Sequence, residues 1–430
     1  MNKYSTFPCI LVLICSLFCT AFSIPEDTAR IPLVKLEDDT SVPYIDDRLP
    51  YYPTNMIVDT DYMSDVDDVT ALKIAALLHK QNRINLLGVA TSTEGDYGTR
   101  GAHGQLSYEG LPNIPMGYSK TGVPETTPFL DYFNQRFSDP QNYTLMDSIE
   151  LYKSILRDIE VSRDMSKINA LSMNGISVND METSEDPAKL MDLVSANAVS
   201  ADLIDRFQYG LNQITYNTIT DFWHETISEN KVRIVVLGYL TNIEDLLKDP
   251  EGYQLVAEKV DSIWVDGGAY PMDGMDNNLG LTGQATCATH YCINNCPVPI
   301  IFITNETGCN YMTGDCVSCG ADLRKYDPDA HDPVSVAFRE MEKNMEGVDT
   351  RGGYSGWDPL AVYAAALPLE ECQMKVSRID AVIKDNGVNV FTLNPEGRHA
   401  ILERTNPNVK WYTEQMNLLI LNSLPGYKPN

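Results

Sequence analysis

Basic residues are scarce in this chain. Its 430 residues include 32 lysines and arginines against 60 aspartates and glutamates, so the formal net charge at pH 7 is −28. A surface this acidic repels phosphate backbones, which argues against nucleic acid as a partner. The same surface attracts divalent cations and suits a soluble secreted protein.

Long apolar segments are also rare, and only Met1–Ser23 resembles a targeting segment. It has a basic residue at Lys3, an apolar stretch at Ile10–Phe22 and small residues around Ser23 that fit a cleavage site. A membrane anchor is the weaker alternative because the stretch is too short to span a bilayer comfortably, and no later segment could span one. The C-terminal Tyr427–Asn430 carries no retention or lipid-anchor signal. We predict secretion or delivery to the lysosome, and cleavage would remove Lys3 and change the net charge from −28 to −29.

No internal repeats divide the chain. Its length, with 43% hydrophobic and 21% charged residues, suffices for one large domain. Ile24–Pro53 is acidic and contains prolines without periodicity, so we predict an extended arm there. A single domain is expected over 54–430, with an insertion around 121–186. That insertion contains an N-glycosylation sequon at Asn142, and a second formal sequon begins at Asn305, at the end of a predicted strand.

Cysteines are concentrated in one region. Of the ten, three lie in the leader, and the other seven are Cys287, Cys292, Cys296, Cys309, Cys316, Cys319 and Cys372. In an oxidising compartment these indicate local disulfides. A zinc site built on Cys316 and Cys319 is the alternative. Seven is an odd number, so one thiol is expected to stay free or to pair between chains, which is compatible with a homo-oligomer.

The apolar periodicity predicts alternating strands and helices. Strands are expected at Met56–Val58, Ile84–Thr91, Ile114–Tyr118, Val232–Leu237, Ser262–Val265 and Pro299–Ile303, with a closing hairpin at Val376–Ile383 and Val388–Leu393. Helices are expected from Ala71 to Leu78 and at Met146–Ile159, Pro187–Phe207, Ile219–Ser228, Ile243–Leu247 and Trp411–Leu424.

The most informative stretch is Met56–Lys80. Directly after its apolar strand come five aspartates within ten residues, which are Asp59, Asp61, Asp65, Asp67 and Asp68. Residues two apart in an extended segment share a face, so Asp59 and Asp61 are expected to point the same way. Asp67 and Asp68 fall at the start of the helix, where negative charge is favoured. Several carboxylates therefore converge at the carboxyl end of a strand, where α/β sheets bind ligands.

Such crowding is unfavourable unless something neutralises it. Two carboxylates at ~4 Å repel by about 4 kcal/mol at an effective dielectric constant near 20. Either some of them stay protonated or a cation holds them together, and Ca²⁺ is the natural candidate. An EF-hand fits poorly because, counting from Asp59, Ser64 and Thr70 stand where its glycine and glutamate are expected. The plainer alternative is that Asp67 caps the helix and the other aspartates form a solvated turn.

Asp59-Thr60-Asp61, followed by Asp67-Asp68 and Ala71-Leu72, resembles the amino-terminal signature of the nucleoside hydrolases. These are Ca²⁺-dependent enzymes that split the N-glycosidic bond of ribonucleosides. Gly238–Asn242 and Trp357–Ala361 resemble two further segments of the family. The resemblance spans Met56–Leu393 and implies an α/β fold, a single large domain whose mostly parallel central sheet is flanked by helices in an open, Rossmann-like arrangement.

The resemblance also implies roles for individual residues. Calcium would be held by Asp61, Asp68, Asp358 and the main-chain carbonyl of Leu237. Asp61 would act as general base toward a water molecule, Asp67 would hold a ribose hydroxyl, and Asp59 would orient its neighbours.

Three positions depart from the family pattern. Asp96 follows Gly95 where the family has asparagine, and a solvated loop acid is the alternative there. Asp276 and Asn278 are the best matches to the ribose-binding loop, although an ordinary surface turn fits them equally. Trp357 precedes Asp358 where many members have a histidine that protonates the leaving base. Tryptophan can stack on a heterocycle but does not act as an acid, and the alternative is a core tryptophan.

These observations predict a secreted, Ca²⁺-dependent hydrolase that releases free base and ribose from purine or pyrimidine nucleosides. One alternative is a secreted calcium-binding protein of the same fold without turnover. Another is a haloacid-dehalogenase-type phosphatase, whose nucleophile also lies in an Asp-x-Asp after the first strand. The downstream motifs that such a phosphatase requires are not evident.

Overall fold

The structure is a computed structural model that describes residues 53–62, 65–124, 130–137, 145–159, 231–310, 314–345, 347–424 and 426–428. Several predictions lie outside the described residues. These are the leader Met1–Ser23, the arm up to residue 52, the sequon at Asn142, and the helices Pro187–Phe207 and Ile219–Ser228.

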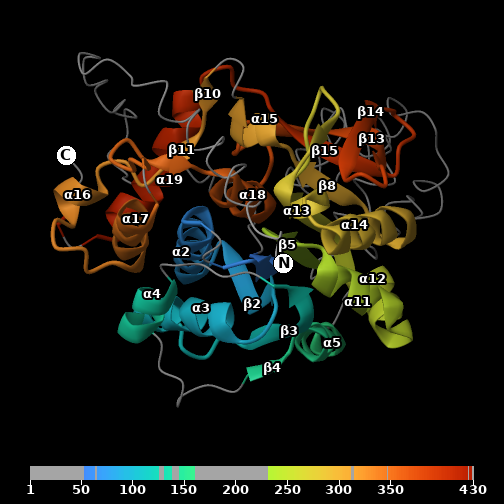
Figure 1. Cartoon of the computed structure of the whole chain (residues 1–430), viewed down its shortest axis with the longest axis horizontal. Helices are drawn as coiled ribbons and strands as arrows, with labels where there is room; N and C mark the ends of the chain where they lie inside the picture. Colours follow the sequence, from blue (N-terminus) through green and yellow to red (C-terminus); the bar gives the residue numbers. More distant parts are fainter. Residues whose placement is uncertain are drawn as a thin grey trace, which may run out of the picture.

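One sheet of 11 strands organises the molecule, in the order β4-β3-β2-β1-β5-β6-β8-β15-β13-β14-β7 (Figure 1). Their bounds are β1 Thr54–Thr60, β2 Ile84–Thr93, β3 Met116–Val123, β4 Leu145–Asp147, β5 Val232–Val236, β6 Val260–Asp266, β7 Gly274–Met275, β8 Ile300–Ile303, β13 Met374–Ile383, β14 Val388–Leu393 and β15 His399–Arg404. All neighbours from β4 to β15 are parallel, whereas β13, β14 and β7 add an antiparallel edge. The predicted α/β fold with a mostly parallel sheet is confirmed.

Helices cover both faces of the sheet. They are α2 Asp67–Lys80, α3 Tyr97–Tyr108, α4 Leu130–Phe137, α5 Ser148–Asp158, α11 Thr241–Lys248, α12 Pro250–Lys259, α13 Asn277–Gly280, α14 Gly283–Asn295, α15 Asn305–Gly308, α16 Leu323–Tyr326, α17 Pro333–Asn344, α18 Trp357–Ala366 and α19 Val409–Asn422. One core joins the sheet to α2, α3, α4, α17, α18 and α19. A second core joins it to α5, α11, α12 and α14 on the other face.

Strand β1 lies inside the sheet, between β2 and β5. Met56 and Val58 face the first core, and Ile57 faces the second, as the two-residue period of a strand requires. All three are fully buried, which is typical of a parallel strand covered on both faces. The carboxyl ends of β1, β5 and β6 therefore lie next to one another at one edge of the sheet. Helices α2 and α18 pack side by side over the first core (Figure 1).

The cysteines form fewer bridges than expected. Two short hairpin strands, β9 (Cys309–Asn310) and β10 (Asp315–Cys316), are joined by a Cys309–Cys316 disulfide. The remaining five, Cys287, Cys292, Cys296, Cys319 and Cys372, are free thiols, so the prediction of several local disulfides is wrong for these. Four of the five are buried as small apolar side chains in the two cores, which explains their presence without a bridge. Zinc ligation by Cys316 is excluded by its disulfide.

Besides the β9–β10 hairpin, another two-stranded sheet lies next to the start of α18, which contains Trp357 and Asp358. It pairs β11 (Ser318–Cys319) with β12 (Tyr354–Ser355), which directly precedes α18. Within the described ranges, no helix combines the length and the apolar character needed to cross a bilayer.

Candidate functional site

Aspartates from three distant segments meet at the carboxyl edge of the parallel sheet. The first segment, which runs from the end of β1 into α2, supplies Asp61, Asp65, Asp67 and Asp68. Asp266 ends β6, and Asp358 lies in the first turn of α18. Asp65, Asp67 and Asp68 each offer a carboxylate oxygen, and these oxygens lie within 4.8 Å of one another. We call the six residues the aspartate group.

The electrostatics show how closely the aspartate group converges. Burial raises the pKa of Asp358 well above its usual value, and the charges of Asp67, Asp68, Asp266 and Asp61 raise it further. The pKa of Asp67 is raised in the same way, by burial first and then by its aspartate neighbours. Burial, Asp276 and two members of the group raise the pKa of Asp266. Acids that lie far apart in the sequence therefore share one site.

The donor set suits a hard divalent cation. Carboxylate oxygens are the ligands that Ca²⁺ and Mg²⁺ prefer, and the largest influences on Asp67, Asp266 and Asp358 are burial and other aspartates. Without positive charge, ionising these groups together is unfavourable. The residues present thus fit a metal ion, which would be held by oxygens of the aspartate group.

Local hydrogen bonds shape the start of α2. The main-chain N–H of Asp67 donates to Oδ1 of Asp65 at 3.0 Å, which closes a tight turn ahead of the helix. The Thr60 hydroxyl donates to Oδ1 of Asp68, so the last residue of β1 is tied to the first turn of α2. Asp67 and Asp68 are 6% and 1% exposed. The turn delivers both carboxylates to the end of the strand.

Asp59 lies inside the protein, beneath this turn. It accepts a hydrogen bond from the Tyr152 hydroxyl at 2.6 Å and two from the Asn242 amide at 3.0 and 3.1 Å. Burial raises its pKa to about 6, although both partners act to lower it. The side chain is fully buried, so its contacts are with α5 and α11 rather than with ligand.

The end of β5 approaches Asp61 closely. A Cβ at Gly238 would lie 2.7 Å from Cγ of Asp61, so only glycine permits this packing. The neighbouring Leu237 donates its main-chain N–H to the carbonyl of Asp59 at 2.7 Å. Its own carbonyl, the predicted metal ligand, accepts from the Asn278 side-chain amide at 2.9 Å. A carbonyl oxygen has two lone pairs, so this bond leaves one for a further partner.

The predicted ribose loop lies beside the aspartate group. Asp276 caps α13, accepting from the main-chain N–H groups of Asn278 at 2.9 Å and Leu279 at 3.1 Å. Burial raises the pKa of Asp276. The Asn278 amide contacts the carbonyl of Asp266 at 3.2 Å as well as that of Leu237. Asn278 therefore connects the ends of β5 and β6.

Trp357 is half-buried at the start of α18, next to Asp358. Its indole N–H donates to the main-chain carbonyl of Asn305 at 3.0 Å. The Asn305 side chain hydrogen-bonds to Asp276, so the formal sequon at Asn305 forms part of the wall of this site. Trp357, Asn305 and Asp276 thus make one connected surface.

Asp96 is placed differently from the other predicted residues. It lies at the start of α3, half-exposed, and pairs with Arg100 at 2.5 Å. None of its described contacts is with the aspartate group.

Sequence reasoning assigned no role to three residues that the structure brings to this site, Asp65, Asp266 and Tyr152, and it named Asn305 only as a formal sequon at the end of a strand. The rule that ligands lie at the carboxyl ends of parallel strands points to Asp266, which ends β6, and to Asn305, which follows β8. Tyr152 comes from α5, and no local signal links that helix to Asp59.

Comparisons with family models and with curated proteins gave no match. Several solved structures are similar over most of the chain, including the following two. An inosine-uridine preferring nucleoside hydrolase from Bacillus anthracis has a TM-score of 0.51 and 14% identity, covering 85% of this chain and 99% of that one. The type III effector protein XopQ, complexed with adenosine diphosphate ribose, has a TM-score of 0.51 and 15% identity, covering 87% and 96%. The protein therefore has a nucleoside hydrolase-like fold. Its sequence has diverged far from both of these proteins, as the identities of 14% and 15% show.

Proposed function

We propose that this protein is a calcium-dependent hydrolase that cleaves the N-glycosidic bond of ribonucleosides and releases free base and ribose. The convergence of Asp61, Asp67, Asp68 and Asp358 at the carboxyl edge of the parallel sheet supports this proposal most directly. The nucleoside hydrolase-like fold agrees with it. The acidic charge and the leader-like Met1–Ser23 are the grounds for proposing secretion, with glycosylation at Asn142.

Scission of the ribosyl C–N bond builds positive charge on the sugar and negative charge on the base. Calcium, held by Asp61, Asp68, Asp358 and the Leu237 carbonyl, would supply charge that favours ionisation of a water molecule. Asp61 would accept the proton of that water, and Asp67 would hold a ribose hydroxyl. Asp59 would orient the end of β1 through its bonds to Tyr152 and Asn242. The remaining negative charge of the aspartate group would stabilise the developing ribosyl cation.

Trp357 gives the leaving base a stacking surface and no proton. Its single polar hydrogen is engaged by the Asn305 carbonyl. Asp276 and Asn278, on the same wall, are the proposed contacts to ribose. Asp96 pairs with Arg100 and would reach the sugar only by giving up that contact.

A calcium-binding protein without turnover is the second candidate. The indole of Trp357 favours this candidate, because the residue directly before Asp358 is then unable to protonate a leaving base. This candidate predicts the same metal site and no release of base.

Incubation of the purified protein with inosine, adenosine, guanosine, uridine and cytidine tests both functions. We expect release of ribose with calcium, loss of release with chelator and recovery on adding calcium back. Asp61→Asn should abolish release, whereas Asp349→Asn, at an exposed aspartate paired with Arg351, should not. Calcium binding without release of base from any nucleoside would favour the second candidate, and absence of calcium binding would overturn both.

A further inference from the structure

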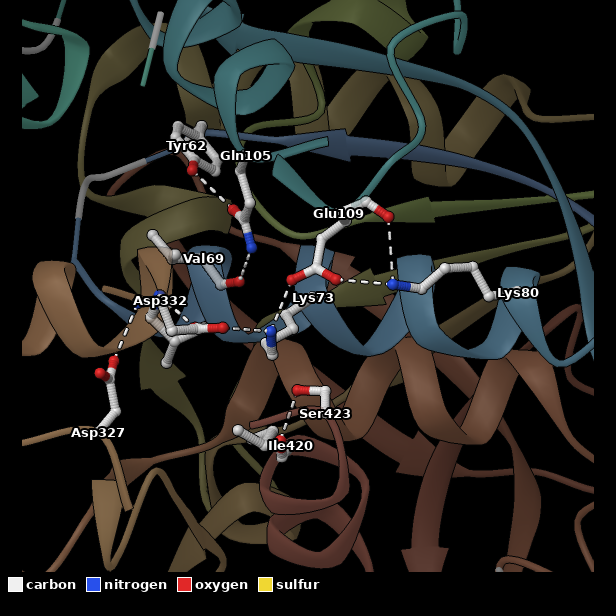
Figure 2. A network of polar contacts seen from close by, with 11 residues as sticks. Tyr62, Val69, Lys73, Lys80, Gln105, Glu109, Asp327, Asp332, Ile420 and Ser423 are labelled. Atoms are coloured by element: carbon white, nitrogen blue, oxygen red, sulfur yellow. Dashed lines mark hydrogen bonds and ion pairs between the residues drawn. The ribbon is translucent and has the colours of Figure 1, made fainter. Parts of the chain in front are cut away.

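One glutamine side chain bridges the two ends of the acid loop, by which we mean the described residues Asp61 and Tyr62 at one end and Asp65 to Val69 at the other (Figure 2). The hydroxyl of Tyr62 donates to Oε1 of Gln105 at 2.7 Å. Nε2 of Gln105 donates to the main-chain carbonyl of Val69 at 2.7 Å. Tyr62 directly follows Asp61, and Val69 directly follows Asp68, so the two contacts fall on opposite sides of the loop.

Both contacts are buried. Gln105 has no exposed surface, and Tyr62 is 1% exposed, with its ring packed edge-on to Phe133. A buried polar group that loses its hydrogen-bond partner destabilises the folded state, because no water replaces the lost bond. The side-chain oxygen of Gln105 accepts from Tyr62, and its side-chain nitrogen donates to Val69. Neither end of the acid loop can move away without breaking a buried hydrogen bond.

Gln105 is itself held in place by the packing of α3 on α2. Glu109 lies one turn after Gln105, and Lys73 lies one turn after Val69, so the two helices meet at matched i, i+4 positions. Lys73 Nζ is 2.6 Å from Oε1 of Glu109 and 2.6 Å from Oδ2 of Asp332 at the start of α17. Figure 2 shows both sets of contacts, with Gln105 between Tyr62 and Val69 and with Glu109 facing Lys73 and Lys80. These ion pairs fix the position of α3 along α2, and that position in turn fixes the side-chain amide of Gln105.

We propose that Gln105 is a positioning residue that sets the distance between Asp61 and Asp68 by holding Tyr62 and Val69 at the same time. The need for such a residue follows from the charges, because carboxylates on the two sides of the loop repel one another. Without the bridge, Tyr62 and Val69 would be free to separate, and the ion site would lose its geometry. The inference rests on the metal site of the proposed function and does not depend on turnover.

Calcium affinity, measured by titration calorimetry on the full-length protein, tests the proposal. Gln105→Met removes both contacts, and Tyr62→Phe removes one. We expect a loss of affinity of tenfold or more for Gln105→Met and a smaller loss for Tyr62→Phe. Because both act through one bridge, the double variant should bind calcium no more weakly than Gln105→Met alone.

Tyr412→Phe is the matched control. Tyr412, on α19, is another fully buried tyrosine. Its hydroxyl donates to the carbonyl of Gln373 at 2.5 Å and accepts from the main-chain N–H of Asn406 at 3.1 Å. Tyr412→Phe should lower the melting temperature in chelator at least as much as Tyr62→Phe and leave calcium affinity unchanged. The inference is overturned if Gln105→Met binds calcium as tightly as wild type, or if Tyr412→Phe loses as much affinity as Tyr62→Phe. Absence of calcium binding by the wild-type protein would instead overturn the metal site of the proposed function, and this inference with it.

Discussion

The indole N–H of Trp357 donates to the main-chain carbonyl of Asn305, and this bond joins the start of α18 to the start of α15. Gly308 lies against the same ring, at a distance that leaves no room for a side chain. Trp357 is therefore held in one orientation beside Asp358. Trp357, the neighbour of the proposed metal ligand Asp358, therefore forms a rigid part of the site's lining.

Replacement of Gly308 by alanine should displace this ring. The added Cβ would lie 2.0 Å from Cδ1 of Trp357, so the indole must move. We expect a loss of about 1–3 kcal/mol in the free energy of unfolding and a change in tryptophan fluorescence. Gly283→Ala is the control, because a Cβ there meets no heavy atom within 4 Å. Equal stability of the two variants in denaturant titrations would contradict the packing described for Trp357.

The engaged indole also predicts a preference among substrates. A base that already carries positive charge, such as that of 7-methylguanosine, departs neutral and needs no proton. We expect kcat/KM for 7-methylguanosine to exceed that for guanosine by about 10²-fold or more, which is the usual contribution of a general acid. Trp357→His should narrow the ratio by accelerating guanosine cleavage. A ratio near one in the wild-type protein would show that another group protonates the base.

Asp358→Asn should have opposite effects with and without metal. In chelator, the buried Asp358 must either ionise beside other aspartates or take up a proton, which is why its pKa is raised. Asparagine avoids this cost, and we expect the free energy of unfolding to rise by about 1–2 kcal/mol. Calcium at 100 times its Kd should stabilise the wild-type protein by about 2.7 kcal/mol. The variant should gain much less from calcium, since it lacks a ligand. Thermal unfolding with and without calcium measures both, and destabilisation in chelator would contradict the repulsion.

The buried pair of Lys73 and Glu109 predicts a pH dependence. Burial by itself raises the pKa of Glu109, but Lys73 and Lys80 lower it below its ordinary value of 4.5. Its stabilising contribution is therefore complete above about pH 4.5 and is lost as the pH falls through the lowered pKa. At pH 7, Glu109→Gln should cost about 3 kcal/mol, because Lys73 keeps only Asp332. Urea unfolding in chelator should show the two proteins converging as the pH falls below 4.5, and a gap independent of pH would contradict this assignment.

Much of the sheet could be predicted because parallel strands covered on both faces are continuous apolar runs. Val232–Leu237 and Ser262–Val265 correspond to β5 and β6, and the hairpin of β13 and β14 is confirmed. Strand β15, His399–Arg404, was not predicted, although it joins β8 to β13. Its apolar part, Ala400–Leu402, is short and is flanked by polar residues, so its position depends on neighbours that are distant in sequence.

The site was predictable where residues are close in sequence and less so where tertiary contacts define it. Asp67 and Asp68 could be placed at a helix start from the pattern alone. The meeting of Asp358 with them required a family resemblance, because no local signal relates α18 to β1. Asp266 and Gln105 take their importance from neighbours across the fold, which only the structure reveals.

The aspartate group draws on the amino-terminal strand, on β6 and on α18, which is made much later. A nascent chain on the ribosome therefore has no complete ion site until α18 has emerged and docked against α2. Capture of the ion would then coincide with the last stage of maturation, and a prematurely terminated polypeptide could not retain it.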